Sequence, residues 1–445
     1  MAKIVLGSWV AGFLLSQGGA AMAQSQELVC DLRTCIDYAL TQSVAVKEAD
    51  AKEISQTAAV LYQQTLFRPT LSLDASGTEI NGESVSAFSV VGVNDPEVVK
   101  KRINYDEYYS INLTFTYPVF KEGVFFGNNP PSVQIAEATR AADTISVYGV
   151  RGDVIYSVSQ LYLTAVKDQK LLKEQEALIK TEKRKYEVVQ SLAEQHLVSD
   201  EELKIAELTW ISSQSTYEQL QNEFTDAVEQ LSKSLGLGPN VVLKINGETP
   251  AYGPLVPLET LIDRALVEHP EIRSQRVTVD GARAELDLSR ANRLPTLDFI
   301  TNYSYADDFN PPGNQLFLSL LSLKIPIFDF GQNSAEIRQS QANVIEKQMT
   351  AEVVKRGIIQ SITVDYSDVR NNASSLKILD IDVQKSQLQL KLVQAKAAQQ
   401  IVPSTAVLDA EEALIEKRKD RIESEFTLLT SYVELQHTAG VPIGP

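Results

Sequence analysis

The sequence contains one structural unit twice, and this repeat limits the possible folds more than any other feature. The motif PTL at residues 69–71 recurs at 295–297, and YPVF at 117–120 recurs as IPIF at 325–328. Further short matches follow in the same order in both halves of the chain. A stretch rich in Pro and Gly, residues 239–257, links the two copies. Each copy is therefore expected to fold into the same succession of elements.

Each copy is predicted to contain a helix, two strands and a long helical hairpin. In repeat 1, residues 24–238, these elements are a helix at 31–67, strands near 70–78 and 107–119, and a hairpin near 131–236. In repeat 2, residues 258–440, they are a helix that precedes Pro295, strands near 296–305 and 315–327, and a hairpin near 331–438. Residues 441–445 form a short tail. The long helices, at 1.5 Å per residue, span roughly 100 Å.

The hairpins have coiled-coil spacing. Leu408, Ile415, Ile422 and Leu429 recur at intervals of seven residues, which is typical of a helix that packs against a neighbouring helix along its length. The turns lie near residues 196–201 and 400–405. Ser199 and Ser404 are predicted to be the N-caps of the returning helices.

Residues 109–117 (YSINLTFTY) alternate between apolar and polar side chains. A period of two predicts a strand with one apolar and one polar face. Its length matches the roughly 9–11 residues of a tilted membrane strand. A half-buried strand of a soluble sandwich is the alternative, but the repeat argues against it. The polar side chains, predicted to face a water-filled lumen, are Ser110, Asn112, Thr114 and Thr116.

Composition argues against several functions. The chain has 41 basic and 58 acidic residues, a net charge of −17, which argues against nucleic-acid binding because phosphate contacts need clustered Lys and Arg. With three His and two Cys, neither a metal centre nor a cofactor is predicted, and His-dependent catalysis has few candidates. We therefore expect a protein that is not an enzyme.

The first residues resemble an export signal. Lys3 precedes an apolar segment at residues 4–15, and Ala21-Met22-Ala23 has the small residues of a cleavage site. Residues 1–23 are therefore predicted to be a signal peptide, which directs the chain to the cell envelope. In that oxidising compartment Cys30 and Cys35 could form a disulfide, and free thiols are the equal alternative.

The strand count determines the assembly. Each chain offers four membrane-type strands, whereas bacterial outer-membrane barrels start at about eight. Open sheet edges do not survive in lipid. The barrel must therefore be shared between chains, with the long helices extending it on one side.

These features resemble the outer membrane efflux protein family, typified by the TolC channel-tunnel. The resemblance rests on the duplication, on PIFDFG at 326–331, on VLDA at 407–410, and on prolines at the junctions between strands and helices. These junction prolines are Pro69, Pro118, Pro295 and Pro326. The family implies a mixed α and β membrane protein. Three identical chains share a twelve-stranded outer-membrane β-barrel, four strands per protomer, continued by a periplasmic α-helical barrel of coiled-coil hairpins.

The resemblance also assigns roles to individual residues. Asp409 matches an aspartate that rings the periplasmic entrance, and the family's companion aspartate is Ala406 here. The family's basic gate residue matches Val402, so the gate ion pair with Glu202 is absent. The hairpin tips, which would contact the adaptor, are His196, Leu197, Val198 and Ser199 in repeat 1 and Gln400, Ile401, Val402 and Pro403 in repeat 2. His196 and Gln400 replace the usual glycine.

The function implied by the resemblance is an exit duct for tripartite efflux, for type I protein secretion, or for both. Its partners would be two further copies of the chain, outer-membrane lipid, a periplasmic adaptor (membrane fusion protein) and an inner-membrane pump of RND, MFS or ABC type. Two alternatives are a periplasmic adaptor and a structural coiled-coil protein of the envelope. An adaptor would have one hairpin flanked by lipoyl-like half-motifs, and a structural coiled coil would not need alternating strands.

Overall fold

The computed structural model describes residues 26–79, 107–238, 241–251, 253–307 and 314–441. The elements of the first half are β1 Gln26–Cys30, α1 Leu32–Gln42, α2 Val44–Thr65, β2 Thr70–Glu79, β3 Glu107–Lys121, β4 Val124–Phe125, α3 Pro131–Glu194 and α4 Asp200–Ser234. Those that follow are β5 Val241–Ile245, α5 Leu258–Glu268, α6 Pro270–Ala291, β6 Thr296–Asp307, β7 Asn314–Lys324, α7 Gln332–Ala398 and α8 Ser404–Thr438.

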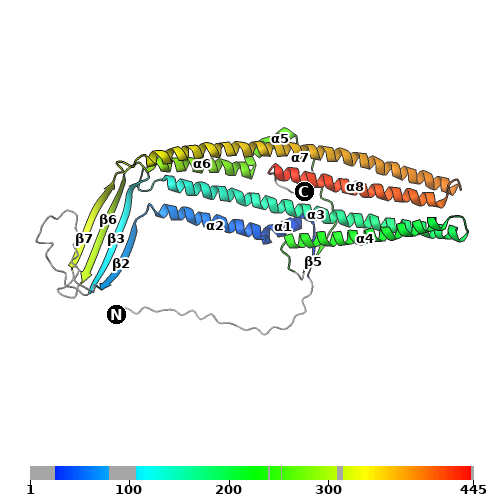
Figure 1. Ribbon diagram of the computed structural model, residues 1–445, viewed down its shortest axis with the longest axis horizontal. Helices are drawn as coiled ribbons and strands as arrows, with labels where there is room; N and C mark the ends of the chain where they lie inside the picture. Colours follow the sequence, from blue (N-terminus) through cyan, green and yellow to red (C-terminus); the bar gives the residue numbers. More distant parts are fainter. Residues whose placement is uncertain (1–25, 80–106, 239–240, 252, 308–313, 442–445) are drawn as a thin grey trace, which may run out of the picture.

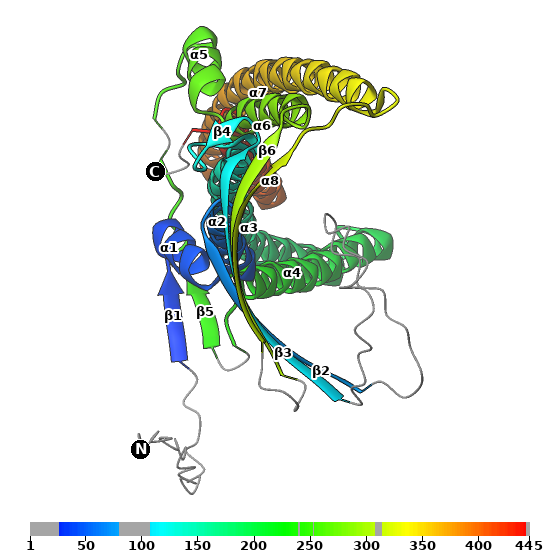
Figure 2. The ribbon, with the colours of Figure 1, turned by 90° about the vertical axis from the view of Figure 1, so that its left-hand side faces the viewer.

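The protein is elongated, with a curved sheet at one end and the tips of two helical hairpins at the other (Figure 1). The sheet has the order β2-β3-β6-β7, with antiparallel neighbours, and the short β4 pairs with β3. Seen from the sheet end, it curves like a segment of a cylinder wall (Figure 2). Its outer strands, β2 and β7, leave two free edges within the described sheet.

The helices form a layer whose neighbours change along its length. Near the sheet, α3 packs against α2 and α6, and α6 packs against α7; farther away, α3 packs against α4 and α8, and α8 against α7. The hairpins α3–α4 and α7–α8 thus contact each other through α3 and α8. We call this contact the α3–α8 seam.

A hydrophobic core at the middle of the layer joins the two halves of the chain. Val158, Tyr162 and Val166 of α3 pack there with Leu231 of α4 and Phe426 of α8. The Tyr162 hydroxyl donates to the carbonyl oxygen of Glu248 at 3.3 Å. α8 thus contributes to a core built mainly by the first half, while a second cluster in the second half joins Ile272 of α6, Ile362 of α7 and Leu435 of α8.

Two strands beside this core were not predicted. β1 and β5 form a parallel two-stranded sheet, in which residues 26–30 pair with residues 241–245 (Figure 2). The stretch 239–257 was expected to be an inter-repeat linker or equatorial segment, with no strand assigned, because its Pro and Gly residues hide the short VVLKI strand. Parallel pairing over such a sequence distance leaves no local signal.

The prediction of one helix at 31–67 was wrong. Ser43 adopts φ −54° and ψ 127°, which ends α1 and begins α2. His269 separates α5 from α6 with nearly the same angles, φ −58° and ψ 125°. Pro270 disfavours the helical conformation at His269, the residue before it. The second half therefore contains a sequence signal for the helix break, whereas the first half has none at Ser43.

The strand and cap predictions had mixed outcomes. β7 ends at Lys324, short of the predicted residue 327, and Pro326 lies beyond it. Ser199 is confirmed as an N-cap, because its hydroxyl accepts a hydrogen bond from the Glu202 backbone N–H at 3.2 Å. Ser404 is not a cap: Pro403 occupies the N-cap position and Ser404 is the first helical residue, where its side chain makes no cap hydrogen bond.

Candidate functional site

The sheet has two different faces. Leu71 and Leu73 of β2 are 67% and 66% exposed, and Ile111 of β3 is 46% exposed on the same face. The predicted polar residues Ser110, Asn112, Thr114 and Thr116 lie on the opposite face, because side chains alternate along a strand. Two of them hydrogen-bond across strands: the Ser110 and Ser76 hydroxyl oxygens are 2.8 Å apart, and Asn302 Nδ2 donates to Thr114 Oγ1 at 2.9 Å.

Strand β7 departs from this pattern. The sequence left its facing open, and the register places Leu316, Leu318 and Leu320 opposite Ser304, Asn302 and Ile300, on the polar face of the sheet. Phe317 and Leu321 lie on the other face, 68% and 66% exposed. Both faces of this edge strand are therefore largely apolar.

The junction prolines occupy different positions. Pro69 and Pro295 immediately precede β2 and β6, and Pro326 follows β7. Pro118 lies inside β3, at an irregularity in its pairing with β6 between Pro118 and Phe120. Proline has no backbone N–H to donate to the hydrogen bonds between strands, and an irregularity in the pairing accommodates it.

Gly127 lets the loop that follows β4 pass very close to Phe67, just beyond the end of α2. Gly127 has φ +67°, and a Cβ there would lie 2.5 Å from Phe67 Cβ. The loop after β4 thus passes directly against the end of α2. Any larger residue would need to displace the Phe67 side chain and adopt a left-handed backbone.

The two hairpin tips have the same geometry. His196 and Gln400 have φ 59° and 60°, the left-handed conformation that favours glycine. At each tip the next residue's N–H reaches back to the last helical turn: Leu197 N donates to Leu192 O at 2.9 Å, and Ile401 N to Lys396 O at 3.0 Å. This is the Schellman arrangement of a helix C-terminus. The replacement of glycine therefore keeps the turn and adds backbone strain.

Asp409 has a partner that the sequence did not reveal. Lys185 Nζ of α3 lies 2.7 Å from Asp409 Oδ1 and 3.1 Å from Glu412 Oε2. Burial acts to lower the pKa of Lys185, but its hydrogen bonds to the two carboxylates more than compensate and raise it to about 12. One sequence signal could have indicated this pair. Two runs of opposite charge lie near the two hairpin turns, KRK at 183–185 and DAEE at 409–412.

Glu182 lies in the same part of the seam. It is 2% exposed, and neither carboxylate oxygen has a hydrogen-bond partner among the described residues. Burial raises the pKa of Glu182 to about 7, and the nearby negative charge of Glu412 adds to the rise. Lys185 is thus surrounded by three carboxylates, and a second ion pair across the seam, Arg184 with Glu411, lies beside them.

Two histidines that are distant in the sequence meet near the middle of the molecule. His437 Nε2 lies 2.8 Å from Asp153 Oδ1, and its ring stacks on Tyr156 with centroids 4.4 Å apart. His269 Nδ1 accepts a hydrogen bond from the Glu271 backbone N–H at 3.2 Å, as a helix cap. Burial and the proximity of His437 lower the pKa of His269. These contacts give both rings structural roles.

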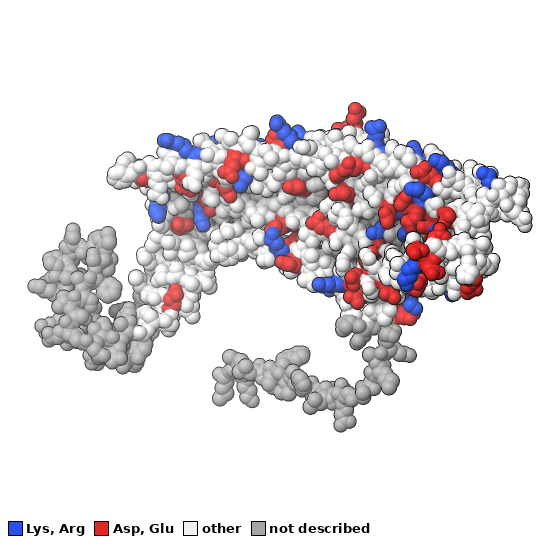
Figure 3. Space-filling model, turned by 45° about the vertical axis from the view of Figure 1, so that its right-hand side comes forward, with Lys and Arg blue, Asp and Glu red and all other residues white. Residues whose placement is uncertain are grey.

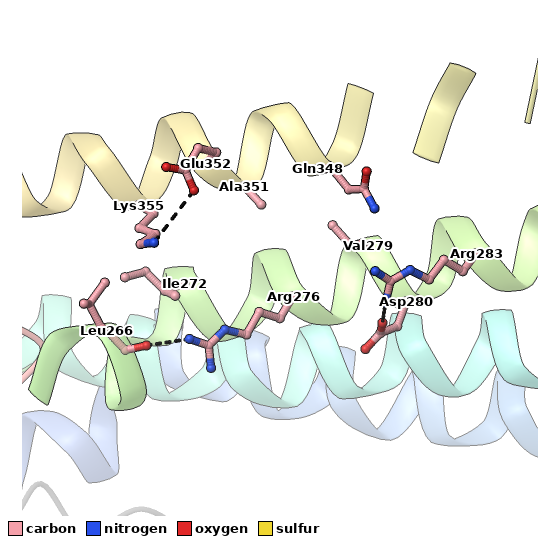
Figure 4. A pocket seen from close by; sticks show the side chains of 10 residues that line it. All are labelled: Leu266, Ile272, Arg276, Val279, Asp280, Arg283, Gln348, Ala351, Glu352 and Lys355. Atoms are coloured by element: carbon pink, nitrogen blue, oxygen red, sulfur yellow. Dashed lines mark hydrogen bonds and ion pairs between the residues drawn. The ribbon is translucent and has the colours of Figure 1, made fainter. Parts of the chain in front are cut away.

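In a shallow groove between α6 and α7, the basic side chains already have hydrogen-bond or ion-pair partners (Figure 4). Arg276 donates to the Leu266 carbonyl oxygen at 2.7 Å, and Arg283 pairs with Asp280 at 2.8 Å. Among the residues that the structure describes, no helix is long and apolar enough to cross a bilayer, and no group of three or more metal-ligating side chains is assembled.

The sequence matches the family described as "Outer membrane efflux protein" over residues 35–237 and 261–441. The chain therefore belongs to this family of outer-membrane channels. It is accordingly an outer-membrane protein with a large periplasmic portion.

The curated relatives are distant. "Outer membrane protein TolC" of Escherichia coli is 22% identical over 236 residues, 49% of this chain and 47% of TolC. "Alkaline protease secretion protein AprF" of Pseudomonas aeruginosa is 24% identical over 183 residues, 40% of this chain and 38% of AprF. The chain thus spans less than half the length of these relatives.

Solved structures agree over nearly the whole chain. The outer-membrane channel OprN has a TM-score of 0.76 at 16% identity and covers 92% of this chain and 90% of its own. VceC of Vibrio cholerae has a TM-score of 0.74 at 17% identity and covers 93% and 97%. These similarities show that the chain has the channel-tunnel fold of the family.

Proposed function

We propose that three copies of this chain form one channel-tunnel across the outer membrane and the periplasm. The observation that carries the proposal is the sheet β2-β3-β6-β7, which has an exposed apolar face, a hydrogen-bonded polar face and free edges at β2 and β7. Pairing β7 of one copy with β2 of the next removes every edge. Three copies give a closed twelve-stranded barrel, within the range of bacterial barrels.

The helical layer supports the same assembly. The outer hairpin helices carry apolar side chains that the described chain leaves uncovered. On α7 these residues are Ile378, Ile381, Leu388 and Leu392, and on α4 they are Ile205, Leu208 and Ile211. We call the first set the α7 stripe and the second the α4 stripe. Because α7 and α4 lie at opposite edges of the hairpin layer, a ring of copies would bring the α7 stripe of one against the α4 stripe of the next.

The repeated order of elements supports a duplicated unit. Residues 24–238 and 258–440, after removal of residues 1–23, would each supply two strands and one hairpin to the ring. Residues 239–257 connect them, and 441–445 are a tail. Asp409, at the entrance half of α8, and the tips around residues 196–199 and 400–403 would line and surround the periplasmic opening.

The tunnel would serve as the exit duct for an inner-membrane pump of RND, MFS or ABC type, reached through a periplasmic adaptor that contacts the tips. The relatives include AprF and "Proteases secretion protein PrtF" of Dickeya chrysanthemi, which supports a type I secretion role, while the family description supports efflux.

The test is extraction and reconstitution. The protein purified from outer membranes in detergent should have the mass of three chains and should conduct ions in planar bilayers. A water-soluble monomer that never inserts into lipid would overturn the proposal. Crosslinking in cells to the adaptor and the pump would then identify the transport system.

A further inference from the structure

The α3–α8 seam is the contact through which the two hairpins of one chain hold together. Along it, Lys419 Nζ donates to Gln175 Oε1 at 3.1 Å, and Lys170 Nζ lies 5.1 Å from the centre of the Phe426 ring. Acidic and basic side chains crowd the part of the helical layer farther from the sheet (Figure 3). Any relative movement of the hairpins must break this seam.

Glu182 is the one seam carboxylate that is buried without a hydrogen-bond donor, among the residues that the structure describes. An ionised carboxylate in such a place would lose its hydration without compensation. The neighbouring cation, Lys185, already serves the Asp409 and Glu412 carboxylates. A protonated carboxyl group avoids this desolvation cost.

The groups that face Glu182 come from three helices. From α8, Glu412 and Asp409 repel a negative charge, and from α3 itself Lys185 attracts one. On the α4 side, Trp210 stacks on Tyr186, one turn from Glu182, with ring centroids 5.5 Å apart. The charged α4 residues nearest to Trp210, Lys204 and Glu207, pair with each other at 2.7 Å.

We propose that Glu182 is a proton-binding latch, which holds the α3–α8 seam closed when protonated and loosens it when ionised. This inference rests on the proposed tunnel, because it assigns the latch to the entrance half of that tunnel. It also offers a closure that does not depend on the family's gate ion pair, which Val402 cannot form.

The sign of the pH dependence follows from the raised pKa. A carboxyl with a pKa of about 7 in the packed seam and of 4.5 when exposed binds a proton more tightly in the closed state. Acid therefore favours closure. The ratio of closed to open seams should fall by up to tenfold per pH unit between about 4.5 and 7, and change little above.

The test uses a fluorophore that is already in place. After removal of the predicted signal peptide, which contains Trp9, Trp210 is the only tryptophan. Its fluorescence in the detergent-purified protein should change with pH at a midpoint near 7. Glu182→Gln, a neutral isostere of the protonated acid, should abolish that transition. Glu187→Gln, on the exposed face of the same helix, should retain it.

Two further variants test the direction of the effect. Glu412→Gln removes a neighbouring negative charge and should lower the midpoint, whereas Lys185→Met removes the attracting cation and should raise it. A midpoint near 4.5 in the parent protein, or a transition unchanged in Glu182→Gln, would overturn the latch.

Channel recordings separate this inference from the proposed function. In planar bilayers, open probability of the parent channel should rise between pH 5 and 7, while that of Glu182→Gln should stay low and flat. A parent channel that conducts equally at every pH would refute the latch and leave the tunnel intact. A protein that never conducts would refute the tunnel itself.

Discussion

The substitution Leu388→Glu should prevent assembly of the trimer while leaving each chain folded. Leu388 is 65% exposed at the centre of the α7 stripe, so little of its side chain is used within one chain. Covering that remaining area should contribute about 1–2 kcal/mol per copy, a fraction of the roughly 1.5–3 kcal/mol for a fully buried Leu. Three copies give about 3–6 kcal/mol per ring. A carboxylate at the same position adds an unpaired buried charge, which costs several kcal/mol more.

The assay is light scattering of the detergent-purified protein, with circular dichroism to follow helix content. Leu388→Glu should have the mass of one chain with unchanged helix content, and Leu388→Ala should remain trimeric but dissociate at a lower temperature. Gln387→Glu is the matched control, because Gln387 is exposed on the same helix but points away from the α7 stripe. A Leu388→Glu trimer as heat-stable as the parent would refute the interface.

Three other predictions concern the tips, the entrance and the thiols. Gln400→Gly should relieve the left-handed strain and stabilise the second tip by about 1 kcal/mol, seen as a higher melting temperature; no gain would mean that Gln400 is not strained. Asp409→Ala should weaken channel block by multivalent cations, and Lys185→Met should strengthen it, because Lys185 neutralises part of the acidic charge; equal block in all forms would contradict both. Burial raises the pKa of the free Cys30 and Cys35 thiols, so both should resist alkylation at pH 8 until the protein is denatured, and rapid labelling of the folded protein would refute this.

The sequence predicted what depends on local pattern. Alternation over residues 109–117 located β3 and its polar face, and the coiled-coil spacing located the hairpins, because both signals lie within one element. The facing of β7 could not be predicted, since leucines occupy both of its faces. The break at Ser43 carries no Pro or Gly, so only comparison with Pro270 in the second half would have exposed it.

The interactions of the candidate site depend on residues brought together by the fold. Lys185 and Glu412 are 227 positions apart, and the sequence gives no register for α3 against α8. The prediction identified Asp409 from the resemblance but not its cation. In the sequence, Glu182 cannot be distinguished from a glutamate on the exposed face of a helix. It is buried only because α8 and α4 pack around α3.

The pairing of β1 with β5 has a consequence for the order of folding. Because residues 26–30 can be paired only after residues 241–245 have been synthesised, the first half of the chain is closed by a strand of the segment that follows it. The described residues of the second half contain no such closing pair, and their α8 packs into the core that the first half builds. During export, the β1–β5 pair should thus form before the second half is present, and the core beside it should become protease-resistant only when α8 packs against α3.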